Sequence, residues 1–306
     1  PANAVRAKRD SSIVRGCRLV REGVADAFFS AGSTGACMAA ATLHMGRVAG
    51  VKRPAIATAI PTGAAPVILL DVGANADCRP EHLVQFAHMG AVYSRVVLGV
   101  ETPSVALLNI GEEPTKGSVL SQEAHRLMSD QIPGFAGNIE GRDVVSGRVD
   151  VIVTDGFTGN VALKLLEGVS ASLLGQVKAA LTATPLSRLG ALTARAPLAA
   201  LKARLDPDTY GGAPLLGVDG VCIIGHGSSG SAAVAAAIRV AARAVHGLDR
   251  LPGARDDAAR VVPAVVVPGQ LLEVPGDAVG LAQLGRAFDR ARELLEGAEQ
   301  LGPDRV

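Results

Sequence analysis

A lysine in a glycine-bordered loop has the surroundings in this sequence that best fit chemistry on an anion. The segment VALLNIGEEPTKG ends an apolar run at Asn109, carries Glu112 and Glu113, and sets Lys116 beside Gly117. A lysine there can bind a phosphate oxygen, or accept a proton if its pKa is lowered. Taken alone the loop fits a solvated lysine better, so the neighbouring loops must decide.

Asparagine side chains follow two further apolar runs. The segment DGFTGN combines Asp155, Gly156, Gly159 and Asn160. An asparagine amide can donate to a phosphate or to a developing oxyanion. The segment FAGNIEGRD adds Asn138 in a similar setting. These residue types suit a site that holds an anion while negative charge develops on a carbonyl oxygen.

Three other turns carry weaker signals. AGSTGA sets free backbone N–H groups where a helix would begin, which favours an anion, through Gly32, Ser33, Thr34 and Gly35. LDVGAN puts Asp71 at the end of a strand and Asn75 in the turn, either as polar orienters or as ties for the turn's backbone. GHGSSG contains His226 but is no G-x-S-x-G elbow, so we expect His226 in a ligand loop or a helix cap.

The elements that must position these loops repeat one rhythm of strand, turn and helix. Five apolar runs each end in a Gly-rich or Asp-containing turn: Asp26–Ala36, Val67–Asp77, Val105–Gly117, Val149–Asn160 and Val221–Gly230. This rhythm predicts an α/β fold, a three-layer α/β/α sandwich with a mostly parallel sheet. Because ligands bind at the carboxyl ends of such strands, we expect all of these turns at one crevice.

The composition excludes several classes of protein. Hydrophobic residues make up 48% of 306, charged residues 19%, and the formal net charge is +1, which indicates a globular domain with a large core. Only 3% are aromatic, so stacking platforms for bases are scarce and we expect no nucleic-acid partner. No apolar run could span a bilayer. The four scattered cysteines fit a reducing cytoplasm. Neither a set of metal ligands nor a nucleotide fingerprint occurs, so we expect no metal and no cofactor.

Three segments depart from this rhythm. Arg6–Glu22 has helical spacing. Residues 178–209 are leucine-rich and basic, and Pro185 and Pro197 divide them, so we expect a projecting helical hairpin inserted into a domain of residues 1–250. The hairpin suits a membrane surface or an acidic partner, but packing on the body or on a second subunit is equally open. Residues 251–306 form an extension with a Pro-rich segment and one amphipathic helix.

Eight segments in this order resemble successive motifs of the phosphate acyltransferase family (PlsX). They are AVRAKRDSS, ADAFFSAGSTGA, RPAIA with a later PT, LLDVGANADCRPEHLVQFAHMG, VALLNIGEEPTKG, FAGNIEGRD, VDVIVTDGFTGNVALKLLEG, and YGGAPLLGV with a later IIGHGSS. The resemblance implies a sandwich similar to the isocitrate/isopropylmalate dehydrogenase and phosphotransacetylase folds, and a homodimer. It implies transfer of a fatty-acyl group from acyl-acyl-carrier protein to inorganic phosphate, giving acyl phosphate for phospholipid synthesis. It also implies a cytoplasmic, peripherally membrane-associated enzyme whose product a membrane glycerol-3-phosphate acyltransferase of the PlsY type consumes.

By this resemblance, Lys116 of the TKG loop and Asn160 of the DGFTGN loop are the catalytic candidates. Phosphate is itself the nucleophile, so the site must hold a dianion in line with a thioester carbonyl and stabilise the oxyanion. Asp71, Asn75 and Asn109, with Asp155, would orient these groups. Acyl-carrier protein is acidic, so docking cations are expected; the candidates are Arg6, Lys8, Arg9, Arg188, Arg195, Lys202 and Arg204.

The sequence departs from the family pattern at two points. The family's N-terminal strand with an Asp-Ala-Met-Gly-Gly-Asp-like turn is not found in it, and Ser33 stands where the family usually has Asn. Two other functions therefore stay open: an inactive scaffold or partner, and a phosphotransacetylase-like enzyme that uses acyl-CoA. A decarboxylating dehydrogenase is less favoured, because the sequence has no metal-binding Asp cluster.

Overall fold

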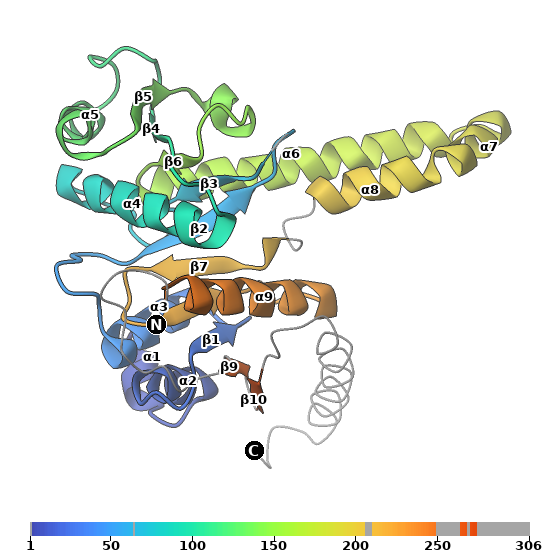
Figure 1. The fold of residues 1–306 in the computed structure, drawn as a ribbon. Helices are drawn as coiled ribbons and strands as arrows, with labels where there is room; N and C mark the ends of the chain where they lie inside the picture. The colour runs from blue at the N-terminus through green and yellow to red at the C-terminus, as the bar shows by residue number, and fades with distance from the viewer. Residues whose placement is uncertain (1, 64, 206–209, 249–263, 268–269, 274–306) are drawn as a thin grey trace.

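One mixed sheet with helices on both faces forms the body of the protein in the computed structural model (Figure 1). The structure describes residues 2–63, 65–205, 210–248, 264–267 and 270–273. Its strands are β1 (Ala27–Ser30), β2 (Ala55–Ile60), β3 (Val67–Leu70), β4 (Val105–Leu108), β5 (Phe135–Ile139), β6 (Val151–Val153), β7 (Ala213–Leu216), β8 (Val221–Ile224), β9 (Ala264–Val267) and β10 (Gln270–Glu273). Across the sheet they follow the order β10-β9-β1-β8-β7-β2-β3-β6-β4-β5.

The helices are α1 (Ala2–Ala7), α2 (Ser12–Arg21), α3 (Thr34–Ala40), α4 (Pro80–Tyr93), α5 (Val119–Gln131), α6 (Gly156–Thr182), α7 (Pro185–Thr193), α8 (Arg195–Leu205) and α9 (Ser231–Leu248). Two π-helical segments, η1 (Ala41–Met45) and η2 (Ser94–Leu98), continue α3 and α4, and η3 (Gly141–Val145) is a 3-10 helix. Each of the five predicted strand–turn–helix units is present. The α/β fold class predicted from the sequence is confirmed.

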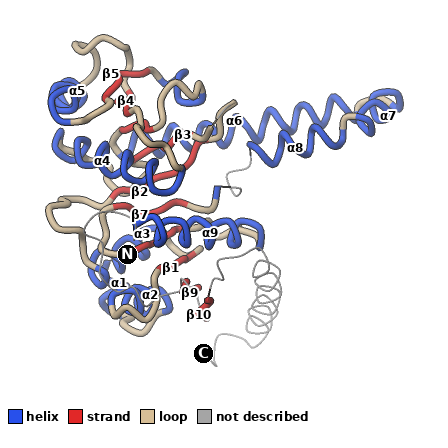
Figure 2. The backbone as a smooth tube through the Cα atoms, in the orientation of Figure 1, coloured by secondary structure: helices blue, strands red, loops and turns tan. Residues whose placement is uncertain are grey.

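Two strands in the middle reverse the direction of the sheet. β8 and β9 run parallel to β1, while β6 runs parallel to β3 and to β4, and β4 to β5. Between these sets β7 is antiparallel to β8 and to β2, and β2 is antiparallel to β3. Figure 2 shows β2 and β7 side by side at the centre of the sheet. The strands β3, β4, β5 and β6 therefore end at one edge, called here the β3 edge. β1 and β8 end at the opposite edge, called the β1 edge, so the expectation of one shared crevice, which assumed one strand direction, is wrong.

Alternation along the strands builds a core on both faces of the sheet. Phe28 of β1 packs in the cluster beneath α2 and α3, whereas Phe29 packs against α9. Leu69 of β3 belongs to the first face, and Ile68 packs beneath α4 and α5. Successive strand residues point to opposite faces, so a strand covered on both faces reads as a continuous apolar run. Helices α1, α2 and α3 thus cover one face, and α4, α5 and α9 cover the other.

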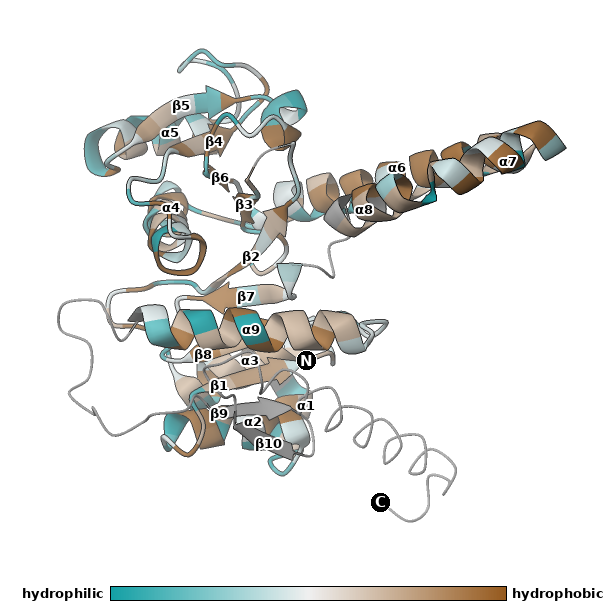
Figure 3. Ribbon diagram, turned by 45° about the vertical axis from the view of Figure 1, so that its right-hand side comes forward, coloured by the Kyte–Doolittle hydropathy of each residue, from teal (hydrophilic) through white to brown (hydrophobic). Residues whose placement is uncertain are grey.

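A helical hairpin of α6, α7 and α8 projects from this body (Figures 1 and 3). Thr184 caps α7 ahead of Pro185, as the sequence suggests. Pro197 instead lies in the first turn of α8, where a proline costs no helical hydrogen bond, so it does not end a helix. In the described part of the chain no helix is long and apolar enough to cross a membrane. The side chains of Lys202 and Arg204 lie outside the described part.

Two segments differ from the sequence-based expectation. Arg6–Glu22 is not one helix, because α2 begins only at Ser12, where the Ser11 hydroxyl accepts from the Val14 N–H at 3.5 Å. Within residues 251–306, β-branched and apolar runs form β9 and β10, and β9 pairs with β1. The predicted last helix of that extension lies outside the described residues.

Candidate active site

The buried carboxylate of Asp71 organises the turn that follows β3. Its Oδ1 accepts from the backbone N–H groups of Ile56 (3.0 Å), Gly73 (3.2 Å) and Ala74 (3.0 Å). Its Oδ2 accepts from the backbone N–H (2.7 Å) and side-chain amide (2.9 Å) of Asn75. Burial raises the pKa of Asp71, and these hydrogen bonds oppose the shift. Donors of the protein itself fill the carboxylate's acceptor sites, so Asp71 shapes the turn.

The first turn of α6 packs directly on this turn because two of its residues are glycines. The Gly156 N–H donates to the Asn75 carbonyl at 2.8 Å. A Cβ at Gly156 would lie 2.7 Å from the Asp71 Oδ2, and a Cβ at Gly159 would overlap the Asp71 carbonyl oxygen. Only residues without a side chain allow this approach. The glycines of DGFTGN are therefore explained by contact between α6 and the Asp71 turn.

Asn160 is exposed in this first turn, and its side chain lies against Gly73. A Cβ at Gly73, whose φ is +133°, would be 3.7 Å from both Cγ and Oδ1 of Asn160. Asp155 caps the helix: Oδ1 accepts from the Thr158 N–H (2.8 Å) and Oδ2 from the Thr158 hydroxyl (2.7 Å). The Asn160 amide has no hydrogen-bond partner among the described residues, so it can donate to a ligand.

Asn109 closes the loop that carries Lys116. Its Nδ2 donates to the Lys116 carbonyl at 3.0 Å, and its Oδ1 accepts from the Ile110 N–H at 2.9 Å. Gly117 has a φ of +90°, and a Cβ there would overlap the Asn109 side chain. The Lys116 side chain is exposed and forms no ion pair within the described part of the chain. Its ammonium is therefore available to an anion.

Asn138 and His125 hold the other side of the Lys116 loop. The Asn138 Nδ2 donates to the Glu113 carbonyl at 3.0 Å, and its Oδ1 lies 2.9 Å from Nδ1 of His125. Because the Asn138 oxygen faces the ring, His125 donates from Nδ1. His125 also meets Phe135 edge-on, with ring centroids 5.2 Å apart. Sequence reasoning missed His125, since it lies on α5 and no local motif joins it to Asn138.

The structure brings nine of the predicted residues to one edge of the sheet. The loops after β3, β4, β5 and β6 carry Asp71, Asn75, Asn109, Lys116, Asn138, Asp155, Gly156, Gly159 and Asn160, all at the β3 edge. The turn Gly32–Gly35 follows β1 and His226 follows β8, so both lie at the β1 edge. There the Ser30 hydroxyl accepts from the Gly32 N–H (3.2 Å), and His226 Nδ1 lies 2.6 Å from the Ser228 hydroxyl.

Cations stand beside the Asp71 turn on the side of α4. Lys52 and Arg53 precede β2, Arg79 precedes α4, and all three are exposed. Burial lowers the pKa of His82, and the charges of Arg53, Lys52 and Arg79 add to the shift against the opposing charge of Glu81. The positive field of these groups favours an anionic ligand at this edge.

The described residues at this edge include no activated protein nucleophile. Burial raises the pKa of the Cys78 thiol to about 11, and the charge of Asp71 adds to the shift, so the thiol stays protonated near neutral pH. In the described chain no group of three His, Cys, Asp or Glu side chains could hold a metal ion.

Comparison with known proteins gives concordant matches. Residues 1–247 match the family described as fatty acid synthesis protein. The chain is 52% identical over 246 residues to a phosphate acyltransferase of Desulfitobacterium hafniense (strain Y51), which covers 80% of this chain and 73% of that relative. It is 53% identical over 245 residues to a phosphate acyltransferase of Heliobacterium modesticaldum, and this match covers 80% of this chain and 73% of that relative. A phosphotransacetylase from Streptococcus pyogenes shares the fold, with a TM-score of 0.53 and 19% identity over 76% of this chain and 67% of that chain.

Proposed function

Since the chain belongs to the phosphate acyltransferase family and is thus an acyltransferase, we propose that it transfers a fatty-acyl group from acyl-acyl-carrier protein to inorganic phosphate. A phosphate oxygen attacks the thioester carbonyl, the new C–O bond forms, and the C–S bond breaks. The sulfur leaves as the carrier's thiol after it takes up the proton that phosphate gives up. The product, an acyl phosphate, serves phospholipid synthesis.

The observation that carries this proposal is the pair of unengaged polar groups at the β3 edge. The Lys116 ammonium and the Asn160 amide are exposed there, while the surrounding carboxylates and amides are used to hold their loops. In the proposed reaction Lys116 binds the phosphate dianion, and Asn160 donates to phosphate or to the oxyanion of the thioester carbonyl. Free donors of this kind suit acyl transfer without a covalent enzyme intermediate.

The donor is proposed to dock through charge. Acyl-carrier protein is acidic, and the exposed cations Arg6, Lys8, Arg9, Arg188 and Arg195 are candidates for its binding surface. Lys52, Arg53 and Arg79 add positive charge at the β3 edge itself. Their position beside the Asp71 turn supports a role in guiding the carrier's phosphate-bearing arm toward the site.

Two surfaces support further proposals about assembly and location. Along α6 exposed apolar residues recur every fourth position, a ridge that suits helix packing in a homodimer: Phe157, Val161, Leu165, Val169, Leu173 and Val177. On α7 Leu186, Leu189 and Leu192 are exposed, which supports contact of the hairpin with a membrane surface. A cytoplasmic enzyme held at the membrane in this way could pass acyl phosphate to a membrane glycerol-3-phosphate acyltransferase of the PlsY type.

The test of the proposed reaction is release of free acyl-carrier protein from palmitoyl-acyl-carrier protein, with and without phosphate. Release that depends on phosphate and yields acyl phosphate is expected. Turnover of palmitoyl-CoA with none of palmitoyl-acyl-carrier protein would instead favour a phosphotransacetylase-like enzyme. No turnover of either donor would contradict the proposed function.

A further inference from the structure

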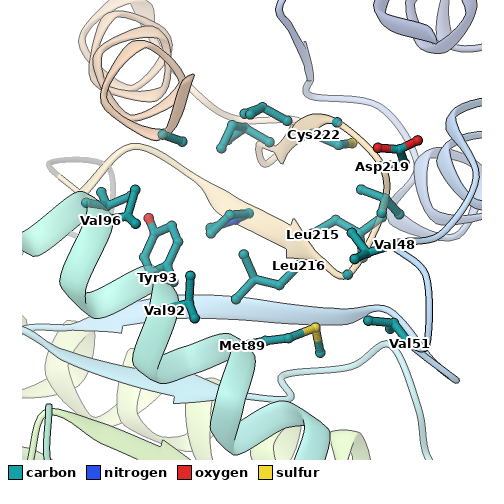
Figure 4. Close-up of a pocket in the computed structure, with 18 of the residues that line it drawn as sticks. Val48, Val51, Met89, Val92, Tyr93, Val96, Leu215, Leu216, Asp219 and Cys222 are labelled. Atoms are coloured by element: carbon teal, nitrogen blue, oxygen red, sulfur yellow. The ribbon is translucent and has the colours of Figure 1, made fainter. Parts of the chain in front are cut away.

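An apolar pocket of about 450 Å³ lies between α4 with η2, α9 and strand β7 (Figure 4). Its walls include Met89, Val92 and Tyr93 from the helix side and Leu216 from the sheet. A pocket of this volume falls within the range of about 300–1,000 Å³ typical of small-molecule sites. The lining is mostly aliphatic and aromatic, with His88 and Asp219 as its charged or titratable members, so most of its surface suits an apolar ligand.

The pocket exists because the core on this face of the sheet is divided. One cluster packs α4 and α5 on β3, β4 and β6, and the other packs α9 on β1 and β8. The reversing strand β7 lies between them, and the pocket runs over it. Val48 and Val92, 46% and 40% exposed, mark where it meets solvent. On the opposite face a single cluster spans both halves of the sheet.

One end of the pocket is next to the candidate active site. Gly217, in the turn after β7, has a φ of +88°, and a Cβ there would lie 2.8 Å from Met89 and 2.9 Å from Val51, and 3.4 Å from Pro54. The carbonyl of the same Pro54 accepts the Asn75 side-chain amide at 2.8 Å. One proline therefore separates the pocket wall from the turn that Asp71 organises.

We propose that this pocket receives the acyl chain of the donor while its thioester lies at the β3 edge. The inference rests on the proposed function, because it takes the long apolar group that such a donor carries as the ligand. Burial of an alkyl chain in an apolar pocket strengthens binding about fourfold for each methylene removed from water. The recessed shape and the position one proline away from the Asp71 turn distinguish this site from the exposed apolar ridge of α6.

Binding to the pocket can be measured without turnover, because the chain has no tryptophan. Val48→Trp puts a single fluorophore at the pocket rim, and a bromine-labelled long-chain fatty acid serves as the quenching probe. Val145→Trp is the matched control, since Val145 is 43% exposed on η3 and is not part of the pocket lining. We expect the probe to quench the fluorescence of the Val48→Trp protein saturably. Half-maximal quenching should occur at a probe concentration at least tenfold lower than in the control. Equal quenching of the two proteins would overturn the proposal.

Chain-length selectivity gives a second readout. Val92→Trp fills the pocket from its exposed rim, and we expect the ratio of kcat/KM for palmitoyl over butyryl donors to fall at least tenfold, while Val145→Trp leaves the ratio unchanged. An unchanged ratio with an altered oligomeric state, measured by light scattering, would mean that the pocket is a contact between copies of the chain, and would overturn the proposal. If the wild-type chain turns over neither donor, the proposed function fails, but the quenching comparison still decides whether the pocket binds an acyl chain.

Discussion

The side chain of Asn160 lies against Gly73, across the boundary between the first turn of α6 and the turn after β3. Gly156 and Gly159 let the start of the helix reach the Asp71 turn, and this brings Asn160 next to Gly73. Backbone packing therefore places Asn160 beside the Asp71 turn, and no hydrogen bond within the described part of the chain engages its amide. An unengaged amide at this place is what the role proposed for Asn160, donation to phosphate or to an oxyanion, requires.

Removal of this donor tests its role directly. Asn160→Ala is expected to lower kcat/KM for phosphate-dependent acyl transfer by roughly 100- to 1,000-fold, the usual effect of removing a donor to a developing oxyanion. Its unfolding free energy should stay within about 0.5 kcal/mol of wild type, because the exposed amide has no partner among the described residues. Asn3→Ala, an exposed asparagine on α1, is the matched control. Equal activity of the two variants would remove Asn160 from the mechanism.

The close packing of α6 on the Asp71 turn predicts a contrast between two glycines of one helix. Gly159→Ala is expected to destabilise the protein by about 3 kcal/mol or more, because its Cβ would overlap the Asp71 carbonyl oxygen. Gly168 lies in the same helix, and a Cβ there would meet nothing within 4 Å. Gly168→Ala should therefore stabilise the protein by roughly 0.5–1 kcal/mol. Urea unfolding of both variants measures the difference. Similar effects of the two substitutions would contradict the contact.

Local sequence predicted the strands that bury both faces, but not the direction in which they pair. Runs such as Val67–Leu70 and Val221–Ile224 are continuous and apolar, because helices cover them on both sides. The reversal depends on β2 and β7, whose pairing joins Ala55 to Leu216 across more than half of the chain. No local pattern encodes such a contact, so the Gly32–Gly35 turn and His226 were expected beside Lys116 and lie at the other edge.

Charge and proton transfer at Lys116 can be separated by substitution. Lys116→Ala is expected to raise KM for phosphate and to lower kcat/KM on the order of 100-fold, because in the proposed reaction the ammonium binds the phosphate dianion. Lys116→Arg keeps the positive charge but cannot give up its proton near neutral pH. If the arginine variant recovers activity, the side chain acts as a charge clamp; if it is as inactive as the alanine variant, a proton-transfer role is favoured. Lys164→Ala, whose ammonium pairs with Glu167 at 2.8 Å, should behave as wild type.

The projecting hairpin predicts a membrane interaction that depends on three leucines. Leu186, Leu189 and Leu192 are 80%, 63% and 66% exposed at spacings that put them on one face of α7. Replacing all three with serine should abolish co-flotation with vesicles that contain an anionic lipid, while Arg188 and Arg195 remain. The control replaces the exposed valines Val24, Val119 and Val145 elsewhere on the body. Flotation that the leucine changes leave intact would count against the membrane role.

The buried cysteines predict a loss of stability at alkaline pH. Burial raises the pKa of the Cys17 thiol from 9.0 to about 12, and the neighbouring Cys37 adds to the shift. Burial likewise raises the pKa of Cys222, with Cys17 and Cys37 adding. Because the folded-state pKa lies above the unfolded one, the folded chain keeps protons that the unfolded chain loses. The stabilisation is complete below the unfolded value of 9.0 and falls as pH rises toward about 12.

The slope of this loss identifies its source. Each shifted thiol contributes about 1.4 kcal/mol per pH unit within the window. Urea unfolding at about pH 8 and about pH 10 should therefore show a smaller drop for Cys17→Ala than for wild type, by about 1 kcal/mol. The comparison uses the difference between the two pH values, so the lost packing of the cysteine, present at both, cancels. Val24→Ala, an exposed position without a titrating group, should keep the wild-type drop. An equal drop in the Cys17→Ala protein would show that the thiol ionises as readily in the folded chain as in the unfolded one.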